Sequence, residues 1–572
     1  MNGRAERGGT VLKQLKDQCC RHSRLLAALV FLAAALLGLA LVGSSGIGVD
    51  EKTERRTLDV NIRAYVELFT GEDSPEAQAI SEHHIAEWRD RDYGQAKFYP
   101  VWPVMHAMEQ DGNYAGMENV YHYYMYLLFV LGSFAVYSIV RRLTKSRGWG
   151  LVTAGLLFVN PRFFTEAFYN NKDIVLLSLC LIVFWLGLVF IQEDSWHSAI
   201  LFGFAGAVAA NSRILGLAAF GLCGIAYLVV RIGNKAWNKR AFWRGFAAVA
   251  AFVLFFILLT PACWSGFFSF WKYLIVGTAN FDAQRWNGWL LYRDAMYNPV
   301  ENPVPWHYIP WLMVITTPLL ILGLAALWPV LLILRCRADA KKWLRTETVF
   351  GLALAVFTAA PVVYAMLARP NLYNGWRHFY FVYGPVVILA GLAAAWLWQS
   401  RRVWLRRVLG AVLAVHLVFY AGYICMYYPH SYAYFNFLAG PHPELSYDAD
   451  YWNISQRELM MEMLDRDPEF SVVCRQPSSM LAWNWYMIKD TVPERFTDKN
   501  EEVSWERRNR AKYVLENTSA LQSSRMHAGD EVNDPAWQEW EAQMAAQEPV
   551  MQIRCGRTVL WRVYENPQCT RE

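Results

Sequence analysis

The sequence has little charge, because only 18% of its 572 residues are Asp, Glu, Lys or Arg, whereas soluble domains carry about 25%. Cysteine is also scarce, with 10 residues, which excludes a small disulfide scaffold. We find no low-complexity tract and no internal repeat, and the second absence argues against a transporter built from duplicated halves. The net charge is +5, but the basic residues are scattered over short loops and form no single patch, so nucleic acid is not an expected partner.

Apolar residues make up 55% of the chain and aromatic residues 15%, and the apolar residues form long blocks. A helix needs about 20 apolar residues to cross the hydrocarbon core of a bilayer. The sequence therefore predicts a polytopic α-helical membrane protein. Its eleven predicted spans are 24–46, 123–140, 149–165, 173–192, 198–212, 213–231, 245–263, 308–334, 348–368, 379–399 and 404–427.

The stretch 198–231 is the weakest part of this assignment, because Asn211-Ser212-Arg213 interrupts it. It reads either as one kinked or re-entrant helix or as two short helices, and its length favours two. Basic residues support the same choice. With the N-terminus inside, the cytoplasmic segments carry most of the loop Lys and Arg, as the positive-inside rule expects. They are 1–24, 141–148, 193–197, 231–244, 335–346 and 400–407, with 6, 4, 0, 5, 5 and 4 such residues.

This topology predicts the organisation of the chain. We expect a basic cytoplasmic segment at 1–23, a transmembrane domain at 24–427 with outer loops at 47–121 and 264–307, and an outer C-terminal domain at 428–572. The segment before the first span is too basic, and the span too long, for a cleaved signal peptide.

The outer parts carry weaker signals of secondary structure. Short apolar runs at 471–473 and 559–561, together with a helical pattern at 455–465, predict a small α/β C-terminal domain. In the first outer loop, 74–93 reads as a surface helix. Cys474, Cys555 and Cys569 of the outer domain permit one disulfide without indicating which pair forms it.

Acidic residues lie at the outer ends of two predicted spans. Asp50 and Glu51 follow the first span, where a carboxylate can bind a divalent cation or act as a general base, or simply stop the helix from sliding. Asp173 begins the fourth predicted span on the same face, where capping the helix is the alternative role. Asp50 and Asp173 could converge on one cation or on one acceptor hydroxyl.

Basic residues occur at the same face. Arg377 and His378 lie among aromatic residues before the tenth predicted span, a setting that suits a phosphate, although a lone Arg often snorkels to lipid headgroups. Arg213 is either a loop charge or a second anion contact. In the 264–307 loop, Arg285 and His307 are further candidates.

Several blocks of this sequence resemble the GT-C superfamily of membrane glycosyltransferases. Within it, the chain is similar to the dolichyl-phosphate-mannose–protein mannosyltransferases and the bacterial lipid A aminoarabinose transferase, and most of all to uncharacterised bacterial members. The similarity extends to about residue 465. The blocks that carry it are Pro161-Arg162-Phe163-Phe164, Asn171-Lys172-Asp173, Pro305-Trp306-His307-Tyr308-Ile309-Pro310, Trp376-Arg377-His378-Phe379-Tyr380, Tyr428-Pro429-His430-Ser431-Tyr432-Ala433-Tyr434-Phe435-Asn436 and Asp450-Tyr451-Trp452.

This resemblance implies a polyprenyl-phosphate sugar donor and a catalytic acidic residue in the first outer loop, which falls on Asp50 or Glu51. It also implies a second acidic residue at Asp173 and a phosphate-binding residue at Arg377. One departure matters. In the protein mannosyltransferases a His and a Gly closely follow the acidic pair, whereas this chain continues Lys52-Thr53-Glu54-Arg55-Arg56. The acceptor type is therefore not carried over, and either carboxylate can be the base.

We therefore expect an inverting glycosyltransferase of a bacterial inner membrane, with its active site in the periplasm and Asp50 as general base. Its partners are the lipid bilayer, a polyprenyl-phosphate sugar and an acceptor protein, lipid or glycan. A divalent metal ion could bind between Asp50 and Asp173, although no Cys/His spacing demands one. The expected donor-phosphate ligands are Arg377, His378, Arg213 and Arg285, and the expected substrate contacts are Arg162, Asn171, Lys172 and His307.

Two functions from other classes compete with this prediction. A membrane transporter or lipid flippase would carry ionisable residues in mid-span, whereas the clearest ones here lie at the outer ends of the spans. A scaffold with an anchored outer domain is the third interpretation, but eleven spans far exceed what an anchor requires.

Overall fold

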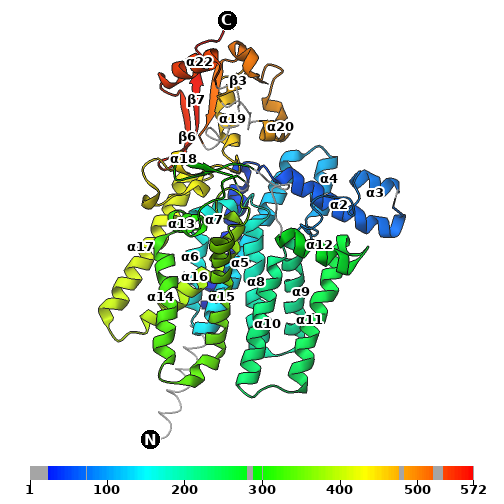
Figure 1. Cartoon of the computed structure of the whole chain (residues 1–572), viewed down its shortest axis with the longest axis vertical. Helices are drawn as coiled ribbons and strands as arrows, with labels where there is room; N and C mark the ends of the chain where they lie inside the picture. The colour runs from blue at the N-terminus through cyan, green and yellow to red at the C-terminus, as the bar shows by residue number, and fades with distance from the viewer. Residues whose placement is uncertain are drawn as a thin grey trace.

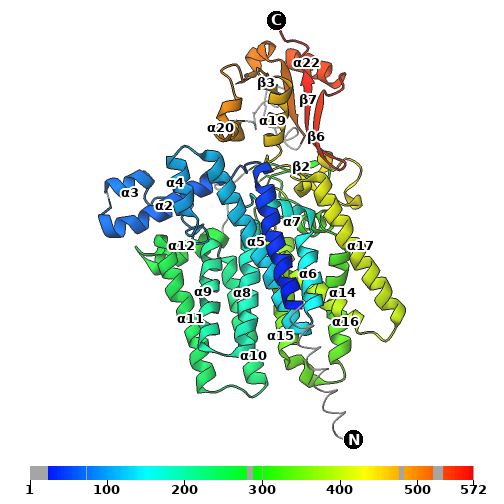
Figure 2. The same ribbon diagram turned by 180° about the vertical axis from the view of Figure 1, so that it is seen from behind.

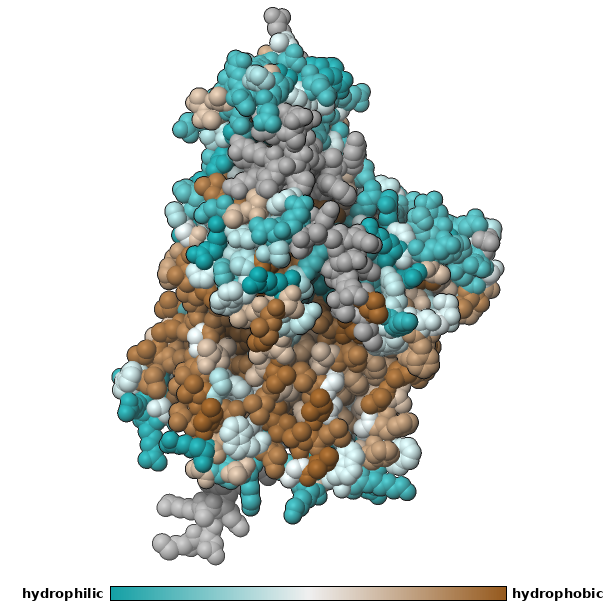
Figure 3. Space-filling model, in the orientation of Figure 1, coloured by the Kyte–Doolittle hydropathy of each residue, from teal (hydrophilic) through white to brown (hydrophobic). Residues whose placement is uncertain are grey.

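The computed structural model describes residues 23–72, 74–279, 288–298, 301–475, 482–518 and 533–570. It is a bundle of long helices with a small domain at one end, which we call the domain end (Figure 1). On the face seen in Figure 3, apolar side chains form a belt across the bundle between two polar ends. Among the described residues, nine helices are long and apolar enough to cross a membrane: Ser23–Ser44, α5 (Tyr114–Thr144), α8 (Asp173–Glu193), α10 (Leu215–Gly233), α11 (Lys239–Leu259), α14 (Leu319–Cys336), α15 (Thr346–Ala368), Arg377–Trp398 with α16 (Tyr383–Trp398), and α17 (Val403–Tyr427).

These helices confirm the predicted multi-pass helical membrane protein. The two other predicted spans are shorter helices, α6 (Arg147–Phe158) and α9 (Trp196–Ser212). The chain turns at residues 213–214 between α9 and α10, so the stretch 198–231 forms two helices as expected. The expected span 149–165 is interrupted instead, because Asn160 caps a new helix, α7 (Pro161–Glu166), by accepting a hydrogen bond from the Phe163 backbone N–H.

The predicted span 308–334 is also interrupted. It consists of α13 (Tyr308–Thr316) and α14, and Thr317 and Pro318 between them have extended backbone. Proline has no backbone N–H and disfavours a helical conformation of the residue before it, so Pro318 explains why the helix is broken at Thr317. As a result, α14 alone is long enough to span the membrane.

Helix α8 lies at the centre of the bundle, beside α5 in both views (Figures 1 and 2). In the 18-residue apolar stretch of α8, 78% of the residues are buried, whereas only 17% are buried in the corresponding stretch of the first helix. The first helix presents exposed leucines along its length, as a helix facing lipid does. Because α8 begins at Asp173, a largely buried helix carries a carboxylate to the domain end.

Three helices of the first long loop lie across the domain end (Figure 2). The predicted surface helix at 74–93 is wrong for most of its length, because only its first residues are helical and the remainder forms turns. Ser74 caps that short helix with proline in its first turn. The long helix starts directly after Asp50 instead. The three helices are α2 (Glu51–Thr70), α3 (Pro75–Ile80) and α4 (Trp102–Gln110).

The C-terminal domain has the predicted α/β character. Its five-stranded sheet has the order β4-β3-β5-β7-β6, parallel across β4-β3-β5 and antiparallel across β5-β7-β6. Cys555 and Cys569 are free thiols. The elements are α19 (Gln456–Arg466), β3 (Ser471–Cys474), α20 (Ala482–Thr491), β4 (Glu501–Glu502), β5 (Tyr513–Asn517), α22 (Pro535–Ala545), β6 (Met551–Cys555) and β7 (Thr558–Glu565).

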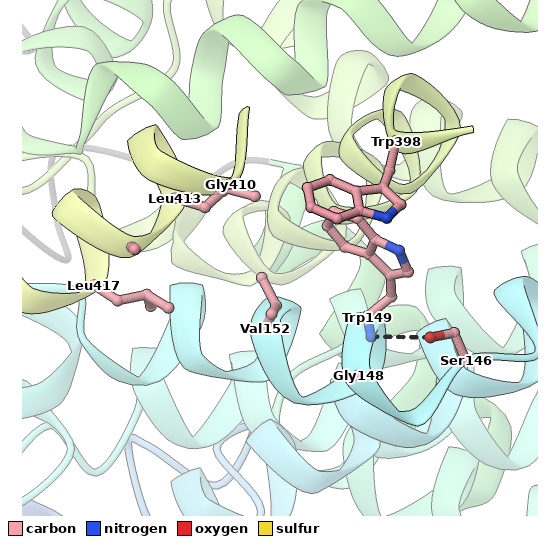
Figure 4. A pocket seen from close by; sticks show the side chains of 9 residues that line it. Ser146, Gly148, Trp149, Val152, Trp398, Gly410, Leu413 and Leu417 are labelled. Atoms are coloured by element: carbon pink, nitrogen blue, oxygen red, sulfur yellow. Dashed lines mark hydrogen bonds between the residues drawn. The ribbon is translucent and has the colours of Figure 1, made fainter. Parts of the chain in front are cut away.

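An apolar pocket of about 370 Å³ lies between α6, α16 and α17, at the end of the bundle opposite the domain (Figure 4). Trp149 and Trp398 line one side of it, and Leu413 and Leu417 line the other. Such a lining suits the apolar chain of a lipid. The polar groups that group-transfer chemistry requires gather at the domain end instead.

Candidate active site at the domain end

Asp50 lies between the end of the first helix and the start of α2, and 30% of its side chain is exposed. Its Oδ2 atom is 3.4 Å from Lys172 Nζ and 3.4 Å from Arg377 Nη1. Burial tends to raise the pKa of Asp50, but the positive charges of Lys172 and Arg377 outweigh it and lower that pKa to about 2. Asp50 is therefore an ionised, accessible carboxylate held between two cations.

A second carboxylate, which the sequence analysis missed, shares one of these cations. Glu54 Oε1 lies 2.9 Å from Lys172 Nζ, and its Oε2 accepts a hydrogen bond from Gln95. Burial raises the pKa of Glu54, while Lys172 and the nearby Lys97 lower it more. Asp50 and Glu54 are four residues apart and so lie on one face of α2, a spacing that could have predicted their proximity.

Lys97 is buried close to this pair and donates a hydrogen bond to the backbone carbonyl of Gly94. Burial lowers the pKa of Lys97 to about 8, although Glu54 acts in the opposite direction. Burial likewise lowers the pKa of Lys172, but Asp50 and Glu54 together raise it above its ordinary value. Lys172 is therefore charged at every physiological pH, whereas Lys97 loses its charge in mildly alkaline solution.

Asp173 pairs with Arg213 across the site. Asp173 Oδ1 is 2.9 Å from Arg213 Nη1, and the side chain of Asn170 accepts a hydrogen bond from the Asp173 backbone N–H at 2.7 Å. Burial lowers the pKa of Arg213, the charge of Asp173 raises it more, and Arg377 is close enough to oppose that rise. The aromatic ring of Tyr93 lies against both Arg213 and Lys172, at 5.6 and 5.4 Å.

Aromatic rings hold the guanidinium of Arg377 in place. It stacks 4.5 Å from the ring of Trp452 and 4.8 Å from that of Tyr373. His378 packs against Tyr373, with 4.6 Å between the two ring centres. Asp50 and these two rings fix the guanidinium in one orientation, so that its planar set of donors can bind a phosphate without first becoming ordered.

Arg162 belongs to a buried network beneath this layer. Its Nη1 atom lies 3.6 Å from Glu166 Oε1, which accepts a 2.8 Å hydrogen bond from Tyr380. The Tyr380 hydroxyl is 3.1 Å from that of Tyr451, and the ring of Tyr451 lies 5.7 Å from Arg377. Burial raises the pKa of Glu166 to about 7. Arg162 is thus linked to the site through other side chains and does not line it directly.

The remaining predicted residues have separate surroundings. Asn171 donates a 3.2 Å hydrogen bond to Tyr121, and His307 Nδ1 lies 2.7 Å from the Tyr292 hydroxyl. Arg285 lies outside the described residues. The structure therefore brings Asp50, Lys172, Asp173, Arg213 and Arg377 together, with His378 beside them.

Glu51 points away from this group although it follows Asp50 directly. Adjacent positions on a helix are about 100° apart, which directs neighbouring side chains to different partners. Glu51 Oε2 lies 2.7 Å from His122 Nε2, and Oε1 accepts from the Gly48 backbone N–H. Burial raises the pKa of Glu51, while the charge of His122 opposes the rise. With Glu118, these residues form a buried cluster that could hold a metal ion.

The predicted metal ligands Asp50 and Asp173 have other partners in this structure. Each faces a cationic side chain, Asp50 facing Lys172 and Arg377, and Asp173 facing Arg213. The sequence also did not predict the cluster of Glu51, Glu118 and His122. Glu118 and His122 lie near the start of α5, just before the apolar residues from which the span 123–140 was predicted.

Part of the chain has a recognisable family pattern. Residues 118–264 match the dolichyl-phosphate-mannose-protein mannosyltransferase family. The match confirms the resemblance to the GT-C superfamily over that part of the chain. The matched segment contains Lys172, Asp173 and Arg213, so these three site residues lie in the part that carries the family pattern.

Three solved structures are similar to the whole chain or most of it. ArnT from Cupriavidus metallidurans bound to undecaprenyl phosphate is 14% identical over 95% of this chain and 99% of that chain, with a TM-score of 0.45. The apo state of the same protein gives 12% identity, the same coverage and a TM-score of 0.43. Arabinofuranosyltransferase AftD from Mycobacteria gives 13% identity over 85% of this chain and 35% of that chain, with a TM-score of 0.42. No curated protein matches the chain.

Proposed function

We propose that this chain is a glycosyltransferase that moves a sugar from a polyprenyl phosphate to an acceptor at the domain end of the bundle. The observation that carries the proposal is the position of Asp50, whose Oδ2 atom lies 3.4 Å from both Lys172 Nζ and Arg377 Nη1. An accessible carboxylate beside two fixed cations combines a proton acceptor with an anion site. The family match over residues 118–264 supports the same reaction class.

The donor phosphate binds to Arg377 and Lys172, with Arg213 and His378 at the edge of the site. In the reaction, the bond between the sugar's anomeric carbon and the phosphate oxygen breaks, and the bonding electrons stay on the phosphate. Fixed cations stabilise the charge that grows on this leaving group, and aromatic stacking keeps the Arg377 guanidinium in place for it. The polyprenyl chain stays in the surrounding lipid.

Asp50 takes the proton from the acceptor as the acceptor's nucleophilic atom forms a bond to the anomeric carbon. This single displacement inverts the anomeric centre. In the free site, Lys172 and Arg377 lower the pKa of Asp50, which makes the carboxylate a weak base. A bound phosphate shares the charge of both cations and thereby strengthens the base when the donor is present.

Asp173 positions Arg213 and does not need to touch the acceptor. Its place at the start of α8 holds the Arg213 guanidinium toward the ring of Tyr93, which also contacts Lys172. Glu54 orients Lys172 in the same way, because its Oε1 atom lies 2.9 Å from Lys172 Nζ. Lys172 and Arg213 thus each have a buried carboxylate that orients them.

We also propose that the domain end faces the periplasm of a bacterial inner membrane, with the N-terminus in the cytoplasm. The opposite end of the bundle carries basic residues such as Arg141-Arg142 and Lys341-Lys342, which the positive-inside rule places in the cytoplasm. A C-terminal alkaline phosphatase fusion tests this orientation. Activity in intact cells supports it, and an inactive but fully expressed fusion contradicts it.

The experiment that tests the function is sugar transfer from a panel of radiolabelled polyprenyl-phosphate sugars in membranes that contain the chain. Wild type is compared with Asp50→Asn and with Asp111→Asn, a matched change at an exposed aspartate after α4. We expect label to reach an acceptor with wild type and with Asp111→Asn, and not with Asp50→Asn. If the expressed wild type consumes no donor, the proposal is wrong, and flipping of the lipid is measured next.

A further inference from the structure

Three buried side chains meet where the first turn of α2 packs against α5. Glu51 comes from the first turn of α2, and Glu118 and His122 come from α5. Glu118 and His122 are four residues apart and therefore lie on one face of their helix. One ligand atom from each of the three residues lies within 4.8 Å of the others, and no side chain among them is more than 7% exposed.

The spacing of these atoms is close to that of a coordination sphere. His122 Nε2 lies 2.7 Å from Glu51 Oε2 and 3.9 Å from Glu118 Oε2. Zinc binds imidazole nitrogen and carboxylate oxygen at about 2.0–2.2 Å, so neighbouring ligand atoms in a tetrahedral site are about 3.3 Å apart. A change of about 0.6 Å in each of these two distances therefore brings it to that of a bound ion.

One oxygen of the cluster has no hydrogen bond to satisfy it. Arg55 pairs with Glu118 Oε1, but within the described part of the chain Glu118 Oε2 has no hydrogen-bond partner although it is buried. Buried carboxylate oxygens without a partner are unfavourable and call for an explanation. A cavity of about 20 Å³, lined by Glu118, His122 and Ser45 among others, adjoins the cluster and is large enough for one water molecule or ion.

A hydrogen bond between Glu51 and His122 would account for those two residues alone. It leaves Glu118 Oε2 unpaired and does not explain why a second carboxylate approaches the same imidazole. Two carboxylates and one imidazole form a mixed oxygen and nitrogen donor set, which suits zinc and its neighbours better than magnesium or calcium. The backbone N–H of Gly48 holds the other oxygen of Glu51, as is common behind metal ligands.

We propose that Glu51, Glu118 and His122 bind a divalent transition-metal ion of the zinc class. The ion takes the place of the proton between Glu51 and His122. It ties the start of α2 to α5 and keeps Glu51 turned away from the cations that surround Asp50. This site is separate from the proposed sugar-transfer chemistry and does not depend on it.

Metal content of the full-length protein in detergent tests this site. The protein is stripped with a chelator, given Zn²⁺, desalted and analysed for bound zinc, and its unfolding temperature is measured with and without the ion. The variants are Glu118→Gln and His122→Asn, with Glu109→Gln and His83→Asn as exposed matched controls. We expect one zinc per chain and a higher unfolding temperature for wild type and controls, and zinc binding at least tenfold weaker in both cluster variants.

Wild type that binds no zinc at micromolar concentration, or folded cluster variants that keep the ion, would overturn the proposal. If a cluster variant does not fold, Co²⁺ added to stripped wild type decides the question. Visible absorption typical of four-coordinate cobalt with nitrogen and oxygen ligands supports the site, and the spectrum of hydrated cobalt contradicts it. None of these measurements involves sugar transfer, so failure of this proposal and failure of the proposed function are separate results.

Discussion

Replacement of Asp50 by Asn should affect catalysis and donor binding in opposite directions. Asn cannot accept the proton of the acceptor, and loss of a general base lowers the rate roughly 10²–10⁴-fold. The same change removes the negative charge that occupies Lys172 and Arg377 in the free site. Both cations then become more available to a phosphate, so the variant should bind a polyprenyl phosphate more tightly than wild type.

The size of this gain follows from the pKa of Asp50. The pKa is 3.8 ordinarily and about 2 in the folded chain, and each pKa unit corresponds to about 1.4 kcal/mol, so the surroundings stabilise the ionised carboxylate by about 2 kcal/mol. Since 30% of the side chain is exposed and water screens part of the interaction, we expect about half of this, roughly 1 kcal/mol, to reappear as phosphate affinity. That is about a fivefold lower dissociation constant.

The assay is a titration of the detergent-solubilised protein with a polyprenyl phosphate, followed by isothermal calorimetry, together with the transfer assay in membranes. Asp111→Asn again serves as the control, and it should match wild type in both measurements. Weaker phosphate binding by Asp50→Asn in a protein that elutes as one folded species would refute the placement of the phosphate on Lys172 and Arg377. Transfer at the wild-type rate would refute the role of Asp50 as base.

Three further predictions concern the other charged groups. Arg377→Lys keeps the charge but loses the planar stack on Trp452, so we expect transfer to fall at least tenfold in the membrane assay, and an unchanged rate would contradict the role of the fixed guanidinium. Arg213→Gln leaves the carboxylate of Asp173 buried without its partner and should cost about 3–5 kcal/mol, seen as a lower unfolding temperature that Arg213→Gln combined with Asp173→Asn partly restores. Lys97 has a pKa of about 8 and loses its charge as the pH rises through that value. Lys172 is then the only one of these two lysines whose positive charge still offsets the charge of Glu54. The affinity for a polyprenyl phosphate should therefore fall between pH 7 and 9 in wild type and stay level in Lys97→Met.

Local chemistry was sufficient to predict the helical architecture. A bilayer requires about 20 apolar residues for each crossing helix, and this requirement acts on contiguous sequence. The interruption at residues 211–213 was predicted correctly for the same reason, since polar residues in succession end an apolar helix. The helix breaks at Asn160 and Pro318 also had local signals, a capping residue and a proline. Each signal lies within a long apolar stretch, so the sequence predicted one continuous span at each place.

The meeting of Asp50, Asp173 and Arg377 at one end was also within reach of the sequence, because each lies at the end of a predicted span and the topology places those ends together. Their pairing was not. Asp50 contacts Lys172 and Arg377, while Asp173 contacts Arg213. The spacing of these residues along the chain would equally allow Asp50 to pair with Arg213 and Asp173 to pair with Arg377.

Only the tertiary structure decided which way each side chain faces. Asp50 and Glu51 are neighbours with the same functional group, yet one faces two cations and the other faces His122 inside the bundle. That difference depends on the rotation of α2 about its own axis and on the helix packed against it. Both are decided by packing between residues far apart in sequence, so a periodic pattern can show which residues share a helix face without showing what that face contacts.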